Sequence, residues 1–332
     1  MCVIIIKNNQ EKLNEGIIAK ALALNPHGFG IQLLDDGTIY KTMDAATAQE
    51  YLRTTRPFVA HARLTTVGRT CLDNVHPVKV NEFNWLFHNG TVSIPHTWDR
   101  DKSDTRFVAE TLRNTNWRNW KNILSMTDSR FCYTRVSKSG KYYINRTGEW
   151  HVQDGVRYSK HNILDYGNNL VAVYGTLRQG YHNHRLLDDA LLIGSGSTLE
   201  SYRMVCDGIP YVLPGDTPEG HRIHVEVYAV TDDQLDSLDG LEGHPTWYQR
   251  VPTQILLDNG MVVTSWLYFN DQANTAGPFY KNYEHYRKPI APVHQPRDIF
   301  SQDLIYDEQE GMYFDLNTDE YLDDNQLNLF DR

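Results

Sequence analysis

The hydrophobic pattern of the first half of the chain predicts a mixture of strands and helices. Residues 2–7 form a nearly continuous apolar run typical of a buried strand, and residues 10–24 carry apolar side chains at helical spacing. Helices are also predicted at residues 44–52 and 104–114, after candidate N-cap side chains. Further strands are predicted at residues 29–34, 58–64 and 84–88, and a hairpin at residues 131–146. This mixture indicates an α+β fold.

The second half of the chain is richer in short strands. The apolar run of residues 170–174 breaks at Gly175, and strands are predicted at residues 224–230 and 264–269. Prolines at positions 289, 292 and 296 then interrupt the pattern. We therefore expect a first domain over residues 1–160, a second domain over residues 169–285 and a tail over residues 286–332.

Length and composition are those of a folded protein with two domains. The chain has 332 residues, of which 40% are hydrophobic and 22% are charged, and this usage excludes global disorder. No stretch approaches 18 consecutive apolar residues, and no secretory signal follows Met1, so we expect a cytoplasmic protein without a membrane span. The four cysteines are scattered and form no CxxC pair. No disulfide framework, metal or cofactor is therefore predicted.

The negative charge is concentrated in the tail. The formal net charge is -10, and residues 298–332 hold eleven Asp or Glu and one Arg, so the rest of the chain is neutral. Nucleic-acid binding depends on Lys and Arg that neutralise phosphates. The charge distribution therefore argues against direct contact with a nucleic acid.

A cysteine follows the initiator methionine. The small side chain of Cys2 favours removal of Met1, which leaves a thiol and a free α-amine on one residue. Such an amine titrates near pH 8, at about the value that suits a base for the thiol. A cysteine at this position is more often incidental, so the interpretation depends on the segments downstream.

Five segments follow Cys2 in order: NPHGFG (25–30), HARLTTVG (61–68), NVHP (74–77), LFHNG (86–90) and SDT (103–105). Over roughly residues 2–155 the sequence resembles the class II (Ntn-type) glutamine amidotransferases. The resemblance implies an αββα Ntn-hydrolase sandwich that releases ammonia from glutamine. It also implies that Cys2 is the nucleophile and forms a γ-glutamyl thioester, while the Asn89 side chain and the Gly90 N–H hold the oxyanion. The alternative for Asn89 and Gly90 is a plain hairpin turn.

The same resemblance implies a binding site for glutamine. Arg63 would bind the α-carboxylate through its guanidinium fork, and Asp104 would bind the α-ammonium. Thr66 matches a residue that lines the glutamine pocket, and His76 matches a histidine near the site, for which we favour a structural role. The alternatives are a surface ion pair for Arg63 and a helix N-terminal residue for Asp104.

A second ordered set begins where an apolar strand enters a tight loop. Its segments are VYGTLRQG (173–180), MVCDGIPYVLP (204–214), VEVY (225–228) and LDGLEGHP (238–245). Over about residues 169–285 the sequence resembles the γ-glutamylcyclotransferase superfamily, which includes γ-glutamylamine cyclotransferases, and this implies a small mixed β-barrel-like domain. The resemblance implies that Tyr174, Gly175, Thr176 and Leu177 bind the γ-glutamyl group and that Glu242 is the general acid and base.

The implied reaction needs only one carboxylate. The α-amine of the substrate attacks its own γ-carbonyl, so the enzyme folds the substrate and moves one proton. An apolar pocket would raise the pKa of Glu242 for this task. We expect the walls of that pocket to come from Tyr248, Tyr268, Trp247 and Leu177. The alternative for Glu242 is a solvated residue, because a glutamate near a helix end is more often exposed to water. Glu226 is a second candidate carboxylate, but its position in a strand of alternating pattern and the family pattern both favour a structural role. Asp239 is predicted to be a capping or turn residue.

The tail ends in a short motif. Its residues Gln326, Leu327, Leu329 and Phe330 resemble the pentapeptide by which bacterial proteins bind the DNA sliding clamp. Composition alone favours a solvated tail, and a tail that folds back onto its own chain is a further alternative.

The two resemblances share the γ-glutamyl group. They predict a bifunctional enzyme that hydrolyses or transfers the amide of glutamine and cyclises γ-glutamyl amines to 5-oxoproline. No synthetase domain is recognisable, so an ammonia-using enzyme or a γ-glutamyl ligase is an expected partner. The alternatives are γ-glutamyl transfer from Cys2 to an amine, and a non-catalytic interaction protein that docks through its acidic tail.

Overall fold

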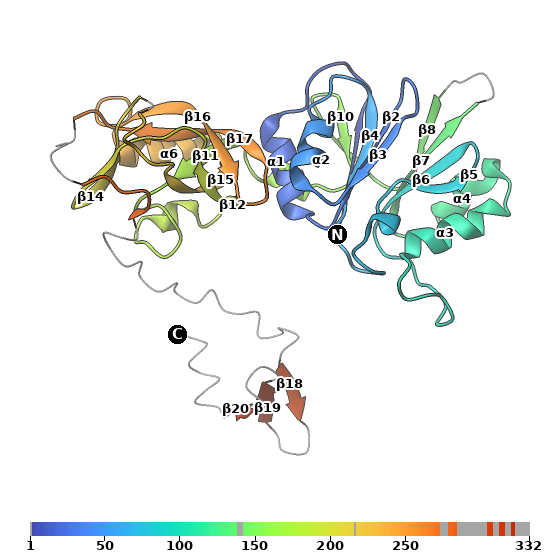
Figure 1. The fold of residues 1–332 in the computed structure, drawn as a ribbon. Helices are drawn as coiled ribbons and strands as arrows, with labels where there is room; N and C mark the ends of the chain where they lie inside the picture. Colours follow the sequence, from blue (N-terminus) through green and yellow to red (C-terminus); the bar gives the residue numbers. More distant parts are fainter. Residues whose placement is uncertain are drawn as a thin grey trace.

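The computed structural model describes residues 2–137, 142–215, 217–272, 278–283, 304–307, 312–315 and 320–322. A region built on two sheets and a region built on a barrel lie side by side (Figure 1). Among the described residues, no helix has both the length and the apolar character needed to cross a lipid bilayer.

The first sheet of the two-sheet region has six antiparallel strands in the order β3-β2-β4-β1-β10-β9. Its strands are β1 (Val3–Lys7), β2 (Phe29–Leu33), β3 (Ile39–Thr42), β4 (Phe58–Ala62), β9 (His151–Gln153) and β10 (Val156–Tyr158). Strand β1 lies in the interior of the sheet, so the residue before it, Cys2, is held beside the end of β4.

The second sheet has four antiparallel strands in the order β5-β6-β7-β8. Its strands are β5 (Val78–Asn81), β6 (Asn84–Asn89), β7 (Arg130–Val136) and β8 (Tyr142–Arg146). The predicted hairpin is present as β7 and β8, and its turn lies outside the described residues. Ile4 and Ile6 of the first sheet share a buried cluster with Phe87 and Cys132 of the second, so the two sheets pack face to face.

Helices cover the outer face of each sheet. They are α1 (Glu15–Leu24), α2 (Ala45–Leu52), α3 (Asp104–Arg113) and α4 (Trp120–Leu124), with a short α5 (Asn162–Asp165) after β10. Ile18 of α1 packs in the cluster that contains Ile31 of the first sheet, and Leu112 of α3 packs with Leu86 of the second. The layers therefore follow the order helix, sheet, sheet, helix.

The barrel region contains a closed five-stranded barrel, as the sequence predicted. Its strands, in order around the barrel, are β11 (Asn169–Val173), β15 (His224–Val230), β12 (Leu191–Thr198), β16 (Gln249–Leu257) and β17 (Val262–Phe269). The single parallel pairing, between β11 and β17, closes it. A hairpin of β13 (Met204–Asp207) and β14 (Ile209–Val212) and the helix α6 (Asp232–Glu242) complete the region.

Alternate residues of β11 serve two different cores. Leu170 and Ala172 pack with the barrel interior, whereas Val171 and Val173 pack with Leu238 of α6. This alternation is the period of two that a strand imposes. It fixes α6 against the outside of the barrel, with its C-terminal end near the end of β11.

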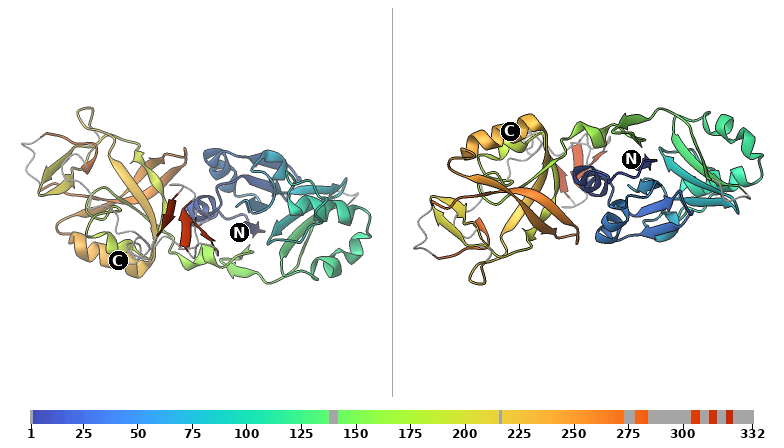
Figure 2. Two further views of the ribbon diagram at one scale, coloured as in Figure 1. Left: turned by 90° about the horizontal axis from the view of Figure 1, so that it is seen from below. Right: turned by 90° about the horizontal axis from the view of Figure 1, so that it is seen from above.

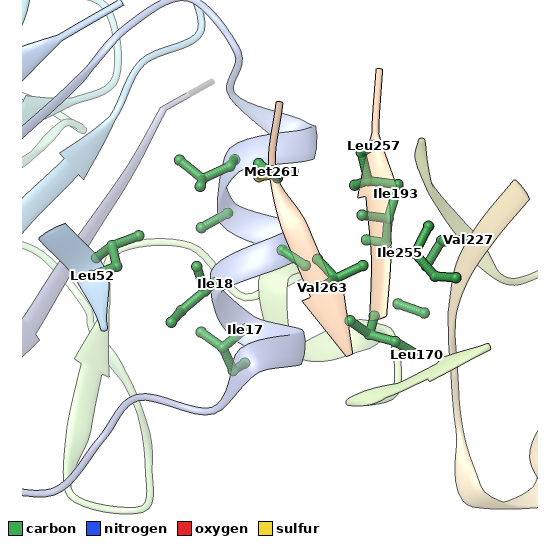
Figure 3. Packing of buried hydrophobic residues seen from close by; sticks show 14 of the residues in the cluster. Ile17, Ile18, Leu52, Leu170, Ile193, Val227, Ile255, Leu257, Met261 and Val263 are labelled. Atoms are coloured by element: carbon green, nitrogen blue, oxygen red, sulfur yellow. The ribbon is translucent and has the colours of Figure 1, made fainter. Parts of the chain in front are cut away.

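One buried cluster runs from α1 into the barrel. Figure 3 shows α1, with Ile17 and Ile18, between Leu52 and Val263 of β17, all of which belong to this cluster. The views from below and above place α1 between the first sheet and the barrel (Figure 2). Hydrogen bonds seal the contact: Gln49 Nε2 and Arg53 Nη2 both donate to the Val262 carbonyl, at 2.9 and 2.8 Å.

Two sequence predictions need correction at the ends of elements. Helix α1 begins at Glu15 and not near residue 10, because the Asn14 side chain accepts the N–H groups of Gly16 and Ile17 and caps the helix there. Strand β4 ends at Ala62 and not at Leu64.

Three short strands pair within the predicted tail. They are β18 (Leu304–Asp307), β19 (Met312–Asp315) and β20 (Glu320–Leu322), which form an antiparallel sheet. The predicted clamp-binding residues Gln326, Leu327, Leu329 and Phe330 lie outside the described residues.

Candidate active sites

A cavity of about 440 Å³ lies where β11 ends. The loop after β11, the β13–β14 hairpin and the C-terminal end of α6 form its walls. All the cavity residues that the sequence predicted line it: Tyr174, Gly175, Thr176, Leu177, Glu242, Trp247, Tyr248 and Tyr268. Asn183, Ile209, Pro210 and Leu241, which belong to the ordered set of the sequence, also line the cavity. His182, to which the sequence pattern assigned no role, completes the wall.

Glu242 is the last residue of α6 and is half-buried. Gly243 follows in the left-handed conformation, with φ of 62°, and ends the helix at once. Burial of the Glu242 carboxylate raises its pKa to about 7. No described residue donates a hydrogen bond to this carboxylate, so nothing holds it permanently in the ionised form. Glu242 can therefore exchange a proton near neutral pH.

The loop after β11 presents backbone donors to the cavity. Asn183 Nδ2 donates to Thr176 Oγ1 at 2.9 Å, and the Asn183 N–H donates to the Thr176 carbonyl at 3.2 Å, which fixes the loop. Within the described chain, the N–H groups of Gly175, Thr176 and Leu177 have no acceptor. A side chain at Gly175 would meet Pro210 Cγ at 2.6 Å, so glycine allows the loop to approach the hairpin. Such a loop can hold a carboxylate or an oxyanion.

Hydroxyl groups of tyrosines brace the cavity walls. Tyr248 donates to the Pro210 carbonyl at 3.0 Å, and Tyr174 donates to the Tyr268 carbonyl at 2.9 Å. Burial raises the pKa of all three tyrosines above its ordinary value, so they stay protonated. Their hydrogen bonds hold the wall of the cavity in place.

Two acidic residues near the cavity have structural partners. Glu226 accepts from the Gln179 N–H and the Tyr228 hydroxyl, each at 2.8 Å, which agrees with its predicted structural role. Asp239 lies inside α6 and accepts the Tyr268 hydroxyl, so the prediction of a capping or turn residue was wrong.

A second, much smaller cavity of about 20 Å³ lies at the edge where β1 begins. Six of the predicted residues line it: Cys2, Arg63, Thr66, His76, Gly90 and Asp104. They come from segments up to about a hundred residues apart in the chain. In this conformation the cavity has room for roughly one water molecule.

The Cys2 thiol is held by the backbone of one residue. Its Sγ atom lies 3.4 Å from both the Leu64 nitrogen, whose N–H donates to it, and the Leu64 carbonyl oxygen, which accepts from it. Burial raises the pKa of the thiol above its ordinary value, and Leu64 only partly offsets this. The thiol is therefore protonated at neutral pH and needs a base to act as a nucleophile.

Arg63 is a buried cation, with only 3% of its surface exposed. Its guanidinium donates to Thr65 Oγ1 at 2.6 Å and to the Val67 carbonyl at 3.0 Å. No carboxylate of the described residues lies within ion-pair distance of it. A buried guanidinium that has only neutral partners is suited to an anionic ligand.

Asp104 is buried at the N-terminus of α3. Its carboxylate accepts the Val92 N–H at 2.9 Å and the Thr105 N–H at 2.8 Å, and His88 Nδ1 lies 3.7 Å away. Burial alone would raise the pKa of Asp104, but the His88 ring and the two N–H donors outweigh it and lower the pKa. Asp104 is thus a fixed anion in the same cavity.

Asn89 does not line this cavity, although Gly90 does. The Asn89 amide donates both of its N–H groups to Ser159, to Oγ at 2.9 Å and to the carbonyl at 3.3 Å. Asn89 Oδ1 is buried and has no partner within the described chain. No pattern in the sequence indicates the contact with Ser159, which lies 70 residues away.

His76 belongs to a buried group of histidines. Its ring is tilted by 32° against that of His61, with the ring centres 3.9 Å apart, and its Nδ1 accepts the His88 N–H at 3.2 Å. Burial lowers the pKa of His76 far below the usual range and that of His61 to about 3. Both rings are therefore neutral, which suits the structural role predicted for His76.

Comparison with known proteins concerns the barrel region. Residues 171–288 match the family described as gamma-glutamyl cyclotransferase, AIG2-like. Over 100 residues the chain is 43% identical to a provisionally named gamma-glutamylcyclotransferase of Methanocaldococcus jannaschii, which covers 30% of this chain and 82% of that protein. It is 42% identical over 98 residues to the human gamma-glutamylaminecyclotransferase, which covers 26% of this chain and 62% of the human protein, less than two thirds. A crystal structure of a mouse AIG2-like protein matches 35% of this chain and 87% of that one, at 31% identity and a TM-score of 0.33.

Proposed function

We propose that this chain, which belongs to the gamma-glutamyl cyclotransferase, AIG2-like family through residues 171–288, releases amines from γ-glutamyl amines. The α-amine nitrogen of the substrate attacks its own γ-carbonyl carbon, and the bond from that carbon to the leaving amine then breaks. Glu242 accepts the proton of the attacking amine and returns it to the leaving nitrogen. The products are 5-oxoproline and the free amine, and no water is consumed.

The observation that carries the proposal is the position of the Glu242 carboxylate. It lies in the cavity that the Tyr174–Leu177 loop also lines, and burial raises its pKa to about 7. A general base and acid works best when its pKa lies near the working pH. An intramolecular reaction demands little more than this group and a cavity that folds the substrate.

The cavity lining also indicates how the substrate is oriented. None of its described residues is Lys or Arg, and we assign the substrate carboxylate and oxyanion to the N–H groups of Gly175, Thr176 and Leu177. Three apolar side chains are both part of the lining and exposed: Ile209 at 38%, Leu241 at 44% and Trp247 at 55%. We assign this apolar rim to the leaving amine.

The test is mass-spectrometric detection of 5-oxoproline with a panel of γ-glutamyl amines. Glu242→Gln keeps the shape of the side chain and removes the proton acceptor, so product formation should fall by about a thousandfold. Glu219→Gln is the matched control, because Glu219 is exposed and outside the cavity. Unchanged turnover in Glu242→Gln contradicts the assignment.

We propose, second, that the two-sheet region cleaves glutamine through Cys2, as an Ntn-type amidotransferase. This proposal is supported by the gathering of a thiol, a buried cation and a buried anion, Cys2, Arg63 and Asp104, at one cavity. The order of layers, helix, sheet, sheet, helix, also fits that fold. Residues 1–160 and 169–285 are then the two catalytic domains.

Two features define what this second activity requires. The cavity of about 20 Å³ must widen before glutamine enters, and the Cys2 amine must be free of Met1 to serve as base. Glutamate and ammonia should appear with processed protein and disappear in Cys2→Ala, while Cys71→Ala serves as control. Added amines that yield γ-glutamyl amines in place of glutamate would favour transfer over hydrolysis. If neither region forms a product, the interaction-protein alternative stands.

A further inference from the structure

A third hollow carries a concentration of positive charge that neither proposed reaction uses. It has a volume of about 290 Å³ and lies between β3, β5, α3 and the 3₁₀ turn η1 (Leu72–Asn74). Its lining residues are Lys41, Asp73, Val78, Lys79, Arg106, Ala109, Glu110 and Arg113. Four cations thus face two carboxylates.

The charges are arranged in two levels. Lys41 and Arg106 are half-buried and form the base of the hollow. The other four charged residues are exposed and form its rim: Asp73, Lys79, Glu110 and Arg113. The rim is neutral as a whole, so the net charge of +2 belongs to the base.

The two base cations have no anionic partner. Among the described residues, no carboxylate lies within 4.0 Å of Lys41 or Arg106. Burial lowers the pKa of Lys41, and the charge of Arg106 lowers it further, although Asp73 opposes both effects. Two cations that are brought together away from water repel each other, and an anion between them would remove that cost.

The hollow is braced before any ligand arrives. Arg113 Nε donates to the Val80 carbonyl at 2.9 Å, and the Lys79 ammonium lies 5.4 Å from the centre of the Trp85 ring. Arg106, Glu110 and Arg113 lie on one face of α3, at spacings of four and three residues. Helix and strand therefore set the cation positions.

We propose that this hollow binds a small dianion of the phosphate monoester type. The charge of the base matches a dianion, and a guanidinium fork such as that of Arg106 fits two phosphate oxygens. The rim of mixed charge offers no continuous positive surface to a polyanion such as a nucleic acid. The volume lies just below the range of about 300 to 1,000 Å³ of ordinary ligand cavities, which favours a small molecule.

The site adjoins the Cys2 cavity. Helix α3 begins with Asp104 and Thr105, which line the Cys2 cavity, and continues with Arg106, which lines the hollow. A bound dianion therefore contacts the same helix turn that holds Asp104.

The test is calorimetric titration of the full chain with inorganic phosphate, glycerol 3-phosphate and succinate, in chloride buffer. Both phosphates should bind, and succinate should bind more weakly. Arg106→Gln and Lys41→Gln should each weaken phosphate binding about tenfold or more, as expected for loss of a charge-assisted contact. Arg118→Gln makes the same charge change at an exposed residue outside the hollow and should bind as the wild type does.

Absence of phosphate binding by folded wild-type protein overturns the proposal, as does equal weakening in Arg118→Gln. Tighter binding of succinate than of either phosphate overturns the ligand class. If Arg106→Gln fails to fold, Arg106→Lys decides: it keeps the charge and loses the fork, so it should weaken binding several-fold.

Discussion

The Tyr268 hydroxyl donates a hydrogen bond of 2.7 Å to Asp239 Oδ1, and this contact joins β17 to α6 one turn before Glu242. Asp239 also forms an ion pair of 2.8 Å with Arg250 of β16. The C-terminal turn of α6 is therefore fixed to two strands of the barrel. This attachment sets where the Glu242 carboxylate enters the cavity.

Removal of the Tyr268 hydroxyl should separate positioning from chemistry. In Tyr268→Phe we expect the free energy of unfolding to fall by about 1 kcal/mol. We also expect kcat for 5-oxoproline formation to fall several-fold, because Asp239 keeps only its ion pair with Arg250 and the C-terminal turn of α6 is held less firmly. Tyr202→Phe is the control: its hydroxyl bonds Glu200 at 2.7 Å, outside the cavity, so it should lower stability and leave kcat unchanged. Equal kcat in both variants would contradict a positioning role.

The rate of cyclisation should depend on pH through Glu242. The carboxylate must be ionised to accept a proton, and burial raises its pKa to about 7. We therefore expect kcat/KM to rise tenfold per pH unit below about pH 7 and to level off above it. A profile of initial rates from pH 5 to 9 measures this, and a rise centred near the ordinary pKa of glutamate would contradict the assigned environment.

The same raised pKa of Glu242 predicts that the free energy of unfolding falls as pH rises, whereas the rate of cyclisation rises. A carboxyl whose folded-state pKa is raised binds its proton more tightly in the folded state, so its stabilising effect is complete below the unfolded pKa and is lost as pH rises through about 7. Glu242→Gln should match the wild type near pH 4 and exceed it by about 1 to 3 kcal/mol at pH 8. Urea unfolding at the two pH values gives the comparison. A variant that is less stable at pH 8 would show that the buried carboxylate has a stabilising partner.

Trp247 should control the preference for the leaving amine. Truncation in Trp247→Ala removes apolar contact from the rim of the cavity, so we expect KM for γ-glutamyl amines with long or aromatic side chains to rise about tenfold, with a smaller effect for methylamine derivatives. Met126→Ala truncates a side chain that is 85% exposed in the other region and should change neither value. Equal effects on large and small amines would place the amine elsewhere.

The reactivity of Cys2 should report its burial. Because burial raises the pKa of the thiol, its alkylation by iodoacetamide should still accelerate above pH 9 in the folded protein. Cys132 is fully buried between the sheets and should react only after unfolding in guanidinium, which supplies an internal reference. Peptide mass spectrometry resolves the two sites. Rapid alkylation of Cys2 at pH 7 would indicate a thiolate and a base already in place.

Lining residues of the cavity in the barrel region could be predicted from the sequence because many of them lie in two compact segments of the chain. The YGTL loop and the LDGLEGHP segment each carry neighbouring residues that remain neighbours in space, as Tyr174 to Leu177 do. Asp239 was misread because its partners, Tyr268 and Arg250, lie on strands that local pattern does not connect with α6.

In the two-sheet region, too, contacts between distant segments could not be predicted from local pattern. Cys2, Arg63 and Asp104 line one cavity, as the order of the motifs predicted. They lie beside the ends of strands or at a helix N-terminus, which hold them in place. The donors of Asn89 point instead to Ser159, on a segment that follows β10. Such a contact depends on how the two sheets pack, and the spacing of residues within a motif does not predict it.

Because one buried core runs from α1 into the barrel, a substitution in either region is expected to lower the stability of both. Ile18 and Val263 belong to different regions but exclude water from one another, so damage to either side is shared. A substitution that loosens α1 would lower the amount of folded barrel in the cell, and with it 5-oxoproline production, without touching Glu242. Substitutions in the two-sheet region are therefore expected to account for part of the variants that lose 5-oxoproline production.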